Sequence, residues 1–222
     1  MTTTDHPYYP VTLDLPTYQP NTLSYVTLIG GWLVALSFVT LSTYAWLSTN
    51  KSLTSGDKWT GVWFMICGCI HVFFEGHFVR HHSTLASKTD FLSQAWKEYS
   101  KSDSRYLTSD PFILVIESIT SVLWGPLCFY VVWSITRGYT SRYVLTALVS
   151  LGHIYGDALY YGTTVMEGAP ASRPEYLYFW IYFVGTNSLW MIAPTILLIH
   201  SIRKINSDIT QLKDIGTTQK KI

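Results

Sequence analysis

The chain has 222 residues and a net charge of +1, and 16% of its residues are aromatic whereas only 13% are charged. Charged residues make up about 25% of an average soluble domain, so this composition argues against a soluble protein. The sequence has no basic stripe, which argues against nucleic acid as a partner. Residues 1–23 are rich in proline and contain no Lys or Arg, and they predict an N-terminal segment that lies on the membrane surface.

Five apolar runs follow, each long enough to cross a bilayer as a helix, which takes about 20 residues. The first run has no ionisable group and predicts a scaffold or packing helix. We therefore predict an all-α integral membrane protein, a five-transmembrane-helix bundle over residues 24–200, followed by a polar and mobile tail over residues 201–222. The predicted spans are residues 24–47, 59–78, 112–136, 142–166 and 176–200.

A long hydrophilic connection, residues 79–111, separates the second and third spans. Its apolar residues recur at helical spacing over residues 89–100, which predicts an amphipathic helix lying over the spans. Basic and acidic side chains nearly cancel here, and this balance favours a folded loop cap over a lipid-binding patch.

The distribution of positive charge predicts the orientation of the chain. Five spans place the two termini on opposite sides of the membrane. Lys and Arg are more frequent in the tail and in the loops after the first and third spans than on the other side. The positive-inside rule then predicts a lumenal N-terminus and a cytosolic C-terminus.

The second span contains two ionisable residues, His71 and Glu75, within apolar surroundings. Residues four apart lie one turn from each other on the same face of a helix. An ionisable residue at the centre of a span costs about 2.5–3.5 kcal/mol on insertion scales, so such residues are candidates for function. The alternative is a helix end at which both side chains reach the headgroups.

Three other spans carry polar stripes at helical spacing, and polar faces of spans point toward the bundle interior. We therefore expect the stripes to converge on a cavity. Two structural alternatives are a contact between Asp157 and His153 and a helix-bridging hydrogen bond from Asn187. The stripes consist of Glu117, Thr120, Ser121 and Trp124 in the third span, Thr146, Ser150, His153, Asp157 and Tyr160 in the fourth, and Trp180, Phe183, Asn187, Trp190 and Pro194 in the fifth.

The stripes combine acids, bases and aromatic walls. Desolvation disfavours the ionised form of a buried carboxyl group, so that group can donate a proton near neutral pH. A neighbouring His can relay the proton. The faces of Trp124, Trp190 and Tyr160 can stabilise a cation by about 2 kcal/mol or more when desolvated. This combination indicates proton-driven chemistry on an apolar substrate through a carbocation.

A metal site is an alternative. His77, His81 and His82 are spaced like one histidine box of the membrane di-iron desaturases and hydroxylases, which carry about three such boxes. The other four histidines form no second box, so we predict no metal. The cysteines all fall within apolar runs and are interpreted as packing residues. They are Cys67, Cys69 and Cys128.

A resemblance to a known family rests on five stretches, IHVFFEGHFV, QAWKEYSKSDSRY, ESITSVLWGP, GHIYGDALYY and YFWIYFVGTNSLWMIAP. They resemble the motifs of the emopamil-binding protein family, the sterol Δ8–Δ7 isomerases. The resemblance implies a multi-pass enzyme of sterol biosynthesis in the endoplasmic reticulum membrane. The implied reaction moves a ring double bond from carbons 8–9 to carbons 7–8. It proceeds by protonation at carbon 9 and deprotonation at carbon 7, without cofactor or metal.

The resemblance also implies roles for particular residues. The family's acid/base residues fall on His71, Glu75 and Glu117. We add two residues of the polar stripes, Trp124 and Asp157, to the substrate-binding set. The family's pocket residues fall on Tyr106, Thr120, Asn187 and Trp190.

Two other functions compete with the isomerase. One is a non-catalytic sterol- or cationic-amine-binding membrane protein of the same superfamily, which includes sigma-2-type receptors. The other is a proton-coupled transporter, which is weaker because no inverted repeat is visible. The presence of both Glu75 and Glu117 together with His71 favours the enzyme. Expected partners are a sterol substrate, lipophilic amine inhibitors and membrane lipid, and a homodimer is left open.

Overall fold

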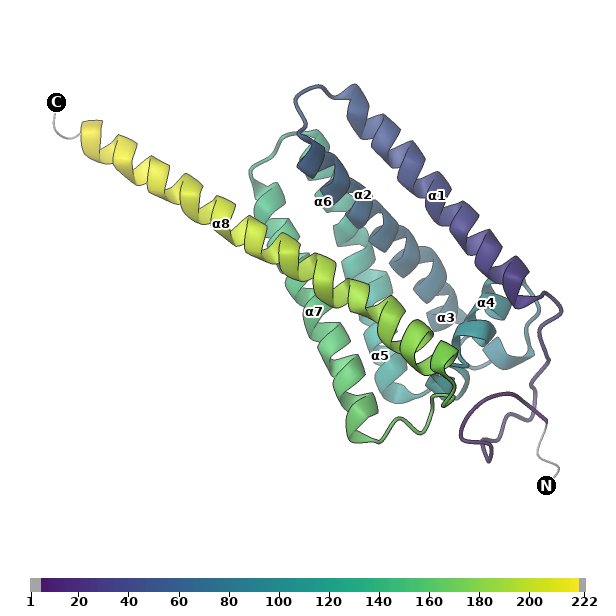
Figure 1. The fold of residues 1–222 in the computed structure, drawn as a ribbon. Coiled ribbons are helices and arrows are strands. Elements are labelled where there is room, and N and C mark those ends of the chain that lie inside the picture. The colour runs from purple at the N-terminus through teal and green to yellow at the C-terminus, as the bar shows by residue number, and fades with distance from the viewer. Residues whose placement is uncertain (1–4, 220–222) are drawn as a thin grey trace.

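A computed structural model describes residues 5–219, and the side chains among them up to residue 215. The described part of the chain is a bundle of long helices and contains no β-strand (Figure 1). The all-α prediction is therefore confirmed. The α-helices are α1 (Tyr25–Thr49), α2 (Ser55–Cys69), α3 (Gly76–His81), α4 (Phe91–Tyr99), α5 (Pro111–Ile119), α6 (Gly125–Thr136), α7 (Ser141–Met166) and α8 (Asn187–Gln219).

Four of the five predicted spans match helical stretches that are long and apolar enough to cross a membrane. The fourth predicted span, residues 142–166, is helix α7, which is not among them because its polar stripe lowers its mean hydropathy. The prediction of five spans is therefore confirmed for four. The four stretches are Tyr25–Thr49, Ser55–His81, Pro111–Thr136 and Leu177–Ile215.

Three π-helical segments interrupt the spans, and the first two lie against each other. Segment η1 (Ile70–Glu75) joins α2 to α3, and η4 (Thr120–Trp124) joins α5 to α6. The third, η5 (Leu177–Thr186), leads into α8. Gly125 and Pro126 follow η4 directly, at the start of α6. Pro126 has no N–H to donate to the carbonyl four residues earlier, so the regular ladder cannot continue through it.

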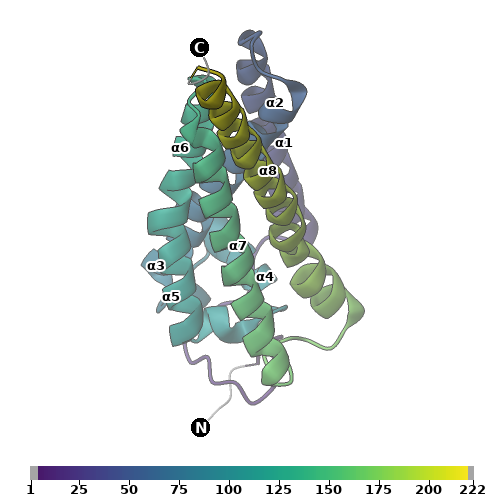
Figure 2. The ribbon, with the colours of Figure 1, turned by 90° about the vertical axis from the view of Figure 1, so that its left-hand side faces the viewer.

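Helix packing places α7 at the centre of one side of the bundle. It contacts α6 and α8, which flank it in Figure 2. Helix α1 packs on α2, where a Cβ on Gly61 would lie 2.6 Å from Leu47 Cδ1. Its other face exposes Leu33, Val34 and Phe38, as expected of a helix against lipid.

The N-terminal segment and the connection pack on each other at one end of the bundle. The predicted amphipathic helix over residues 89–100 is α4. Tyr8 is 2% exposed, and its hydroxyl donates a hydrogen bond to the Lys97 carbonyl at 3.1 Å. Lys97 Nζ donates in turn to the Gln19 carbonyl at 2.7 Å. Burial lowers the pKa of the Lys97 ammonium group, which has a neutral acceptor here.

The polar tail, which the sequence predicts to be mobile, is helical in its described part. Helix α8 continues to Gln219 and projects beyond the bundle, while residues 220–222 lie outside the described residues (Figure 1). No helix-breaking Pro or Gly occurs between residues 201 and 215. Lys204 also pairs with Asp208 one turn later, which stabilises the helix. The described ends of the chain lie at opposite ends of the bundle in both views (Figures 1 and 2).

Candidate functional site

A cavity of about 670 Å³ lies inside the bundle, and its walls are mostly apolar. This volume is within the range of roughly 300–1,000 Å³ that is typical of small-molecule sites. Every site residue predicted from the sequence lines this cavity. They are His71, Glu75, Tyr106, Glu117, Thr120, Trp124, Asp157, Asn187 and Trp190.

His71 and Glu75 form a close pair on the π segment η1. The wider turn of a π-helix places residues four apart nearly above one another, and such segments are frequent at functional sites. His71 Nδ1 and Glu75 Oε2 are 2.7 Å apart, and His71 is 2% exposed. The imidazole therefore lies in the bundle interior rather than at the headgroups.

The second nitrogen of His71 contacts a histidine from another helix. His71 Nε2 lies 3.0 Å from His153 Nε2 on α7. If His71 donates its Nδ1–H to Glu75, its Nε2 accepts the proton of His153 Nε2. His153 Nδ1 then remains a buried acceptor, and it has no hydrogen-bond partner.

His153 contacts His71 instead of Asp157, which was the structural alternative for these two residues of α7. His153 Nδ1 and Asp157 Oδ2 both lack a hydrogen-bond partner, so the two side chains do not form the contact that their spacing allows. The sequence places His153 on a polar stripe but not in the predicted site. Its helical spacing from Asp157 and Tyr160 was the signal that it faces the cavity.

Glu117 lies next to Glu75 in the cavity wall and is held by two hydroxyl groups. Its Oε1 accepts a hydrogen bond from the Tyr106 hydroxyl at 2.6 Å, and Thr120 Oγ1 lies 3.5 Å from its Oε2. Glu117 and Glu75 are also electrostatic neighbours. Two neighbouring carboxylates in an apolar cavity cannot both ionise without a large cost. This arrangement therefore favours one protonated carboxyl group, which can donate a proton, and one ionised carboxylate, which can accept one.

Tyr106 comes from the connection rather than from a span, and its position depends on its neighbours in the segment Ser104–Leu107. Arg105 pairs with Asp103 at 2.7 Å, and its guanidinium lies 5.4 Å from the ring of Tyr160 on α7. It also donates a hydrogen bond to Thr164. This anchoring to α7 holds the adjacent Tyr106 hydroxyl on Glu117.

The close approach of η1 and η4 requires a glycine. A Cβ on Gly125 would lie 2.6 Å from Val72 Cγ2 and 3.1 Å from His71 Cβ. Only a residue without a side chain lets the two π segments meet at this distance. Gly125 therefore brings the Glu117 side of the cavity next to His71.

Aromatic rings complete the cavity wall. Trp190 packs against Trp63 with ring centroids 5.8 Å apart. Asn187 donates to the Tyr99 hydroxyl at 3.0 Å, so it links α8 to the connection as well as lining the cavity. The buried Trp190 Nε1 has no hydrogen-bond partner and is available to a polar group of a ligand.

The histidines of the suspected box serve separate contacts. His77 Nε2 bonds Ser93 Oγ at 2.8 Å, and His82 Nδ1 bonds Ser109 Oγ at 2.9 Å. His81 packs its ring against that of His77. These contacts are local links between α3 and the connection.

Fold and site together define a class of protein. It is a multi-helix protein with apolar, membrane-type helices and an apolar cavity that is lined by paired acid and base groups. The chain belongs to the EBP family, because the family model described as EXPERA (EXPanded EBP superfamily) matches residues 91–201 and close relatives cover most of its length.

Three relatives carry the name 3-beta-hydroxysteroid-Delta(8),Delta(7)-isomerase. The mouse (Mus musculus) protein is 38% identical over 209 residues, which is 91% of this chain and 89% of the relative. The rat (Rattus norvegicus) protein is 41% identical over 207 residues, with the same two shares. The guinea pig (Cavia porcellus) protein is 39% identical over 206 residues, which is 90% of this chain and 88% of the relative.

Proposed function

We propose that this protein is a sterol isomerase that converts a Δ8-sterol to a Δ7-sterol. The observation that carries the proposal is the pairing of Glu117 with the Glu75–His71 pair inside one apolar cavity. Relatives that bear the isomerase name support the sterol as substrate. The reaction needs no oxidant or reductant, because the double bond only changes place.

The mechanism uses one proton donor and one proton acceptor. Protonation of carbon 9 uses the electron pair of the 8–9 double bond and leaves a cation at carbon 8. Loss of a proton from carbon 7 then forms the 7–8 double bond, so one proton enters and one leaves. We assign these two steps to Glu117 and to the Glu75–His71 pair, which line the cavity next to each other. Each is a group of the type that contributes about 10²–10⁴-fold as a positioned acid or base.

Incubation with a Δ8-sterol in deuterated water tests the proposed function. Purified protein should form a Δ7-sterol with one deuterium at carbon 9, because the donor group exchanges its proton with solvent between turnovers. Mass spectrometry of the product measures both the conversion and the label. A protein that only binds sterols would return the Δ8-sterol unchanged and unlabelled, and that result would contradict the proposal.

The aromatic wall should bind cations more tightly than neutral ligands. A lipophilic tertiary amine carries a positive charge on an apolar body and so resembles the carbocation. Trp190→Leu keeps apolar bulk but removes the ring quadrupole, so amine affinity should fall by about 0.5–2 kcal/mol while sterol affinity changes less. Affinities of one amine and one neutral sterol, measured in parallel, check this expectation. Equal losses of affinity for both ligands would show that the site recognises the shape of the ligand rather than its charge.

The membrane arrangement is part of the proposal. We assign α7 as the fifth span, because its polar stripe faces the cavity whereas Val144, Leu148 and Leu151 are exposed on its other face. The connection and the N-terminal segment then cap the cavity. The membrane is that of the endoplasmic reticulum, with a lumenal N-terminus and a cytosolic C-terminus.

Protease protection of tags in intact microsomes tests this orientation. A C-terminal tag should be digested from outside, whereas an N-terminal tag should stay protected until detergent opens the vesicles. The two described ends of the chain lie at opposite ends of the bundle, and this arrangement supports the expectation (Figure 2). Equal protection of both tags would contradict an odd number of spans.

A further inference from the structure

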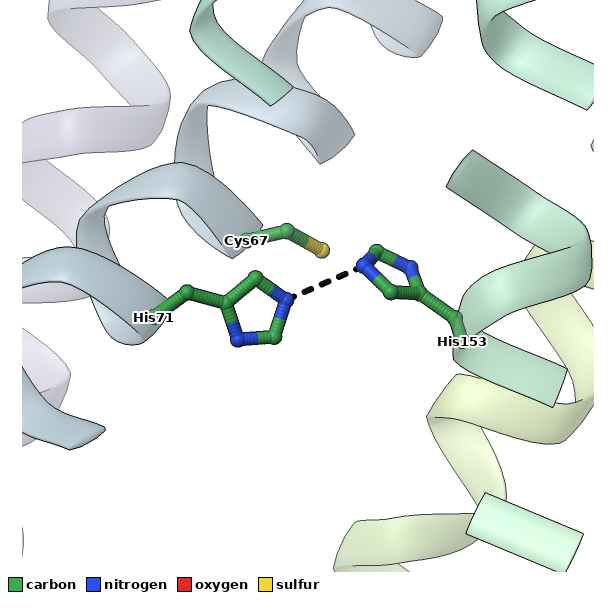
Figure 3. A group of neighbouring side chains, drawn as sticks. All are labelled: Cys67, His71 and His153. Atoms are coloured by element: carbon green, nitrogen blue, oxygen red, sulfur yellow. Dashed lines mark hydrogen bonds between the residues drawn. The ribbon is translucent and has the colours of Figure 1, made fainter. Parts of the chain in front are cut away.

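The cavity wall contains a cluster of three metal-ligating side chains. Cys67 lies one turn before His71 on the same face of the second span, and His153 approaches from α7 (Figure 3). Their ligand atoms all lie within 4.8 Å of one another. The three residues are 0%, 2% and 4% exposed, so bulk water does not compete for the site.

We propose that Cys67, His71 and His153 form an inhibitory binding site for a thiophilic divalent cation, with Zn²⁺ as its representative. Cysteine thiolate and histidine imidazole are the usual zinc ligands, three protein ligands leave a fourth position open, and the sulfur disfavours Mg²⁺ and Ca²⁺. Zinc bonds of 2.0–2.3 Å place tetrahedral ligand atoms roughly 3.3–3.8 Å apart. The two histidine nitrogens now lie 3.0 Å apart, so side-chain shifts of about 1 Å would close the site.

The surroundings of the cluster fit a bound zinc ion. His71 Nδ1 already contacts Glu75 Oε2 at 2.7 Å, which is the carboxylate–histidine arrangement that orients zinc-binding imidazoles. The dication would be balanced by the Cys67 thiolate and the Glu75 carboxylate, so the site would hold no net charge. Cys128 Sγ lies 4.0 Å from His153 Nε2 and is a further potential sulfur ligand beside the cluster.

Bound zinc would occupy the nitrogen that links His71 to His153. His71 could then no longer accept or release a proton through Nε2, and Glu75 would be committed to charge balance. Inhibition therefore rests on the proposed function, whereas zinc binding rests on the cluster alone. The metal would be an inhibitor and not a cofactor, so the prediction of a metal-free reaction is unaffected.

Zinc binding to the full chain, purified in detergent and freed of metal with a chelator, tests the site. Calorimetry should show a high-affinity zinc ion, and X-ray absorption should show a Zn–S bond of about 2.3 Å with Zn–N bonds of about 2.0–2.1 Å. The sulfur signal excludes surface histidines such as His77 and His81. A shell without sulfur would overturn the proposal.

Three variants connect the binding to the cluster. Cys67→Ser and His153→Gln should each weaken zinc binding by about 100-fold, since even outer-shell losses cost 10–100-fold. Cys69→Ser is the matched control, because Cys69 lies two residues further on the same helix and outside the cluster. The two cluster variants lie on different helices, so a folding failure of one leaves the other informative. Unchanged affinity in both would overturn the site.

Isomerase assays separate this inference from the proposed function. Zinc should inhibit the wild-type protein, and Cys67→Ser should need at least about tenfold more zinc for the same fractional inhibition. Full activity at saturating, sulfur-ligated zinc would overturn the inhibitory role. A sulfur-ligated zinc site in a protein without isomerase activity would contradict the proposed function and leave the metal site standing.

Discussion

Glu117→Gln should retain the fold and sterol binding but lose turnover by about 10²–10⁴-fold, the usual range for a positioned acid or base. The amide has nearly the same shape as the carboxyl group. Its oxygen can still accept the hydrogen bond that Tyr106 now donates to Glu117 at 2.6 Å. It cannot exchange a proton with carbon 7 or carbon 9. The loss should therefore appear in kcat rather than in KM.

The measurement is single-turnover conversion of a Δ8-sterol, together with amine binding and thermal unfolding as tests of folding. Glu175→Gln is a suitable control, because this glutamate pairs with Arg173 outside the cavity. It should keep wild-type turnover. Wild-type turnover in a well-folded Glu117→Gln protein would remove Glu117 from the mechanism.

Gly152→Ala should lower turnover by about 10–100-fold. A Cβ on Gly152 would lie 2.6 Å from Trp124 Cζ2, so the rigid indole must move from the cavity wall. A misplacement of about 1 Å at a reacting centre can cost 10²-fold in rate. Alanine is favoured over glycine by about 0.8–1 kcal/mol inside a helix, so lost activity could not be blamed on a weaker helix.

Gly162→Ala is the matched control for this substitution. Gly162 lies in the same helix, and a Cβ there would meet no atom within 4 Å. It should gain the helix stability that alanine has over glycine, and it should keep wild-type turnover. Turnover and thermal unfolding of both variants check the pair of expectations. Equal turnover in the two variants would show that the position of Trp124 does not matter.

Local periodicity explains what could be predicted from the sequence. The apolar runs define four spans and the all-helical fold, because lipid requires every backbone polar group of a span to be satisfied within it. The spacing of Glu117, Thr120 and Trp124 places them on one face of a helix. The expectation that polar faces turn inward then places the predicted site residues of the spans on one cavity, whereas Tyr106 of the connection followed from the family resemblance.

Helix α7 is not among the candidate spans of the structure, for the same reason that it carries part of the site. Its buried polar residues, including His153 and Asp157, lower its mean hydropathy. The polar composition of the tail likewise could not predict its secondary structure. Polarity suggested a mobile segment, but polar residues without Pro or Gly are compatible with the helix that α8 forms through Gln219.

By itself, the sequence determined the helices and the face of each helix that turns inward, because both depend on residues within a few turns of one another. Only the tertiary structure decided which atoms meet. The bond between His71 and His153 joins residues 82 positions apart. The contact of Tyr106 with Glu117 depends on how Arg105 is anchored to α7. Such contacts depend on the rotation and separation of packed helices, which here involve two π segments that meet at the glycine at 125.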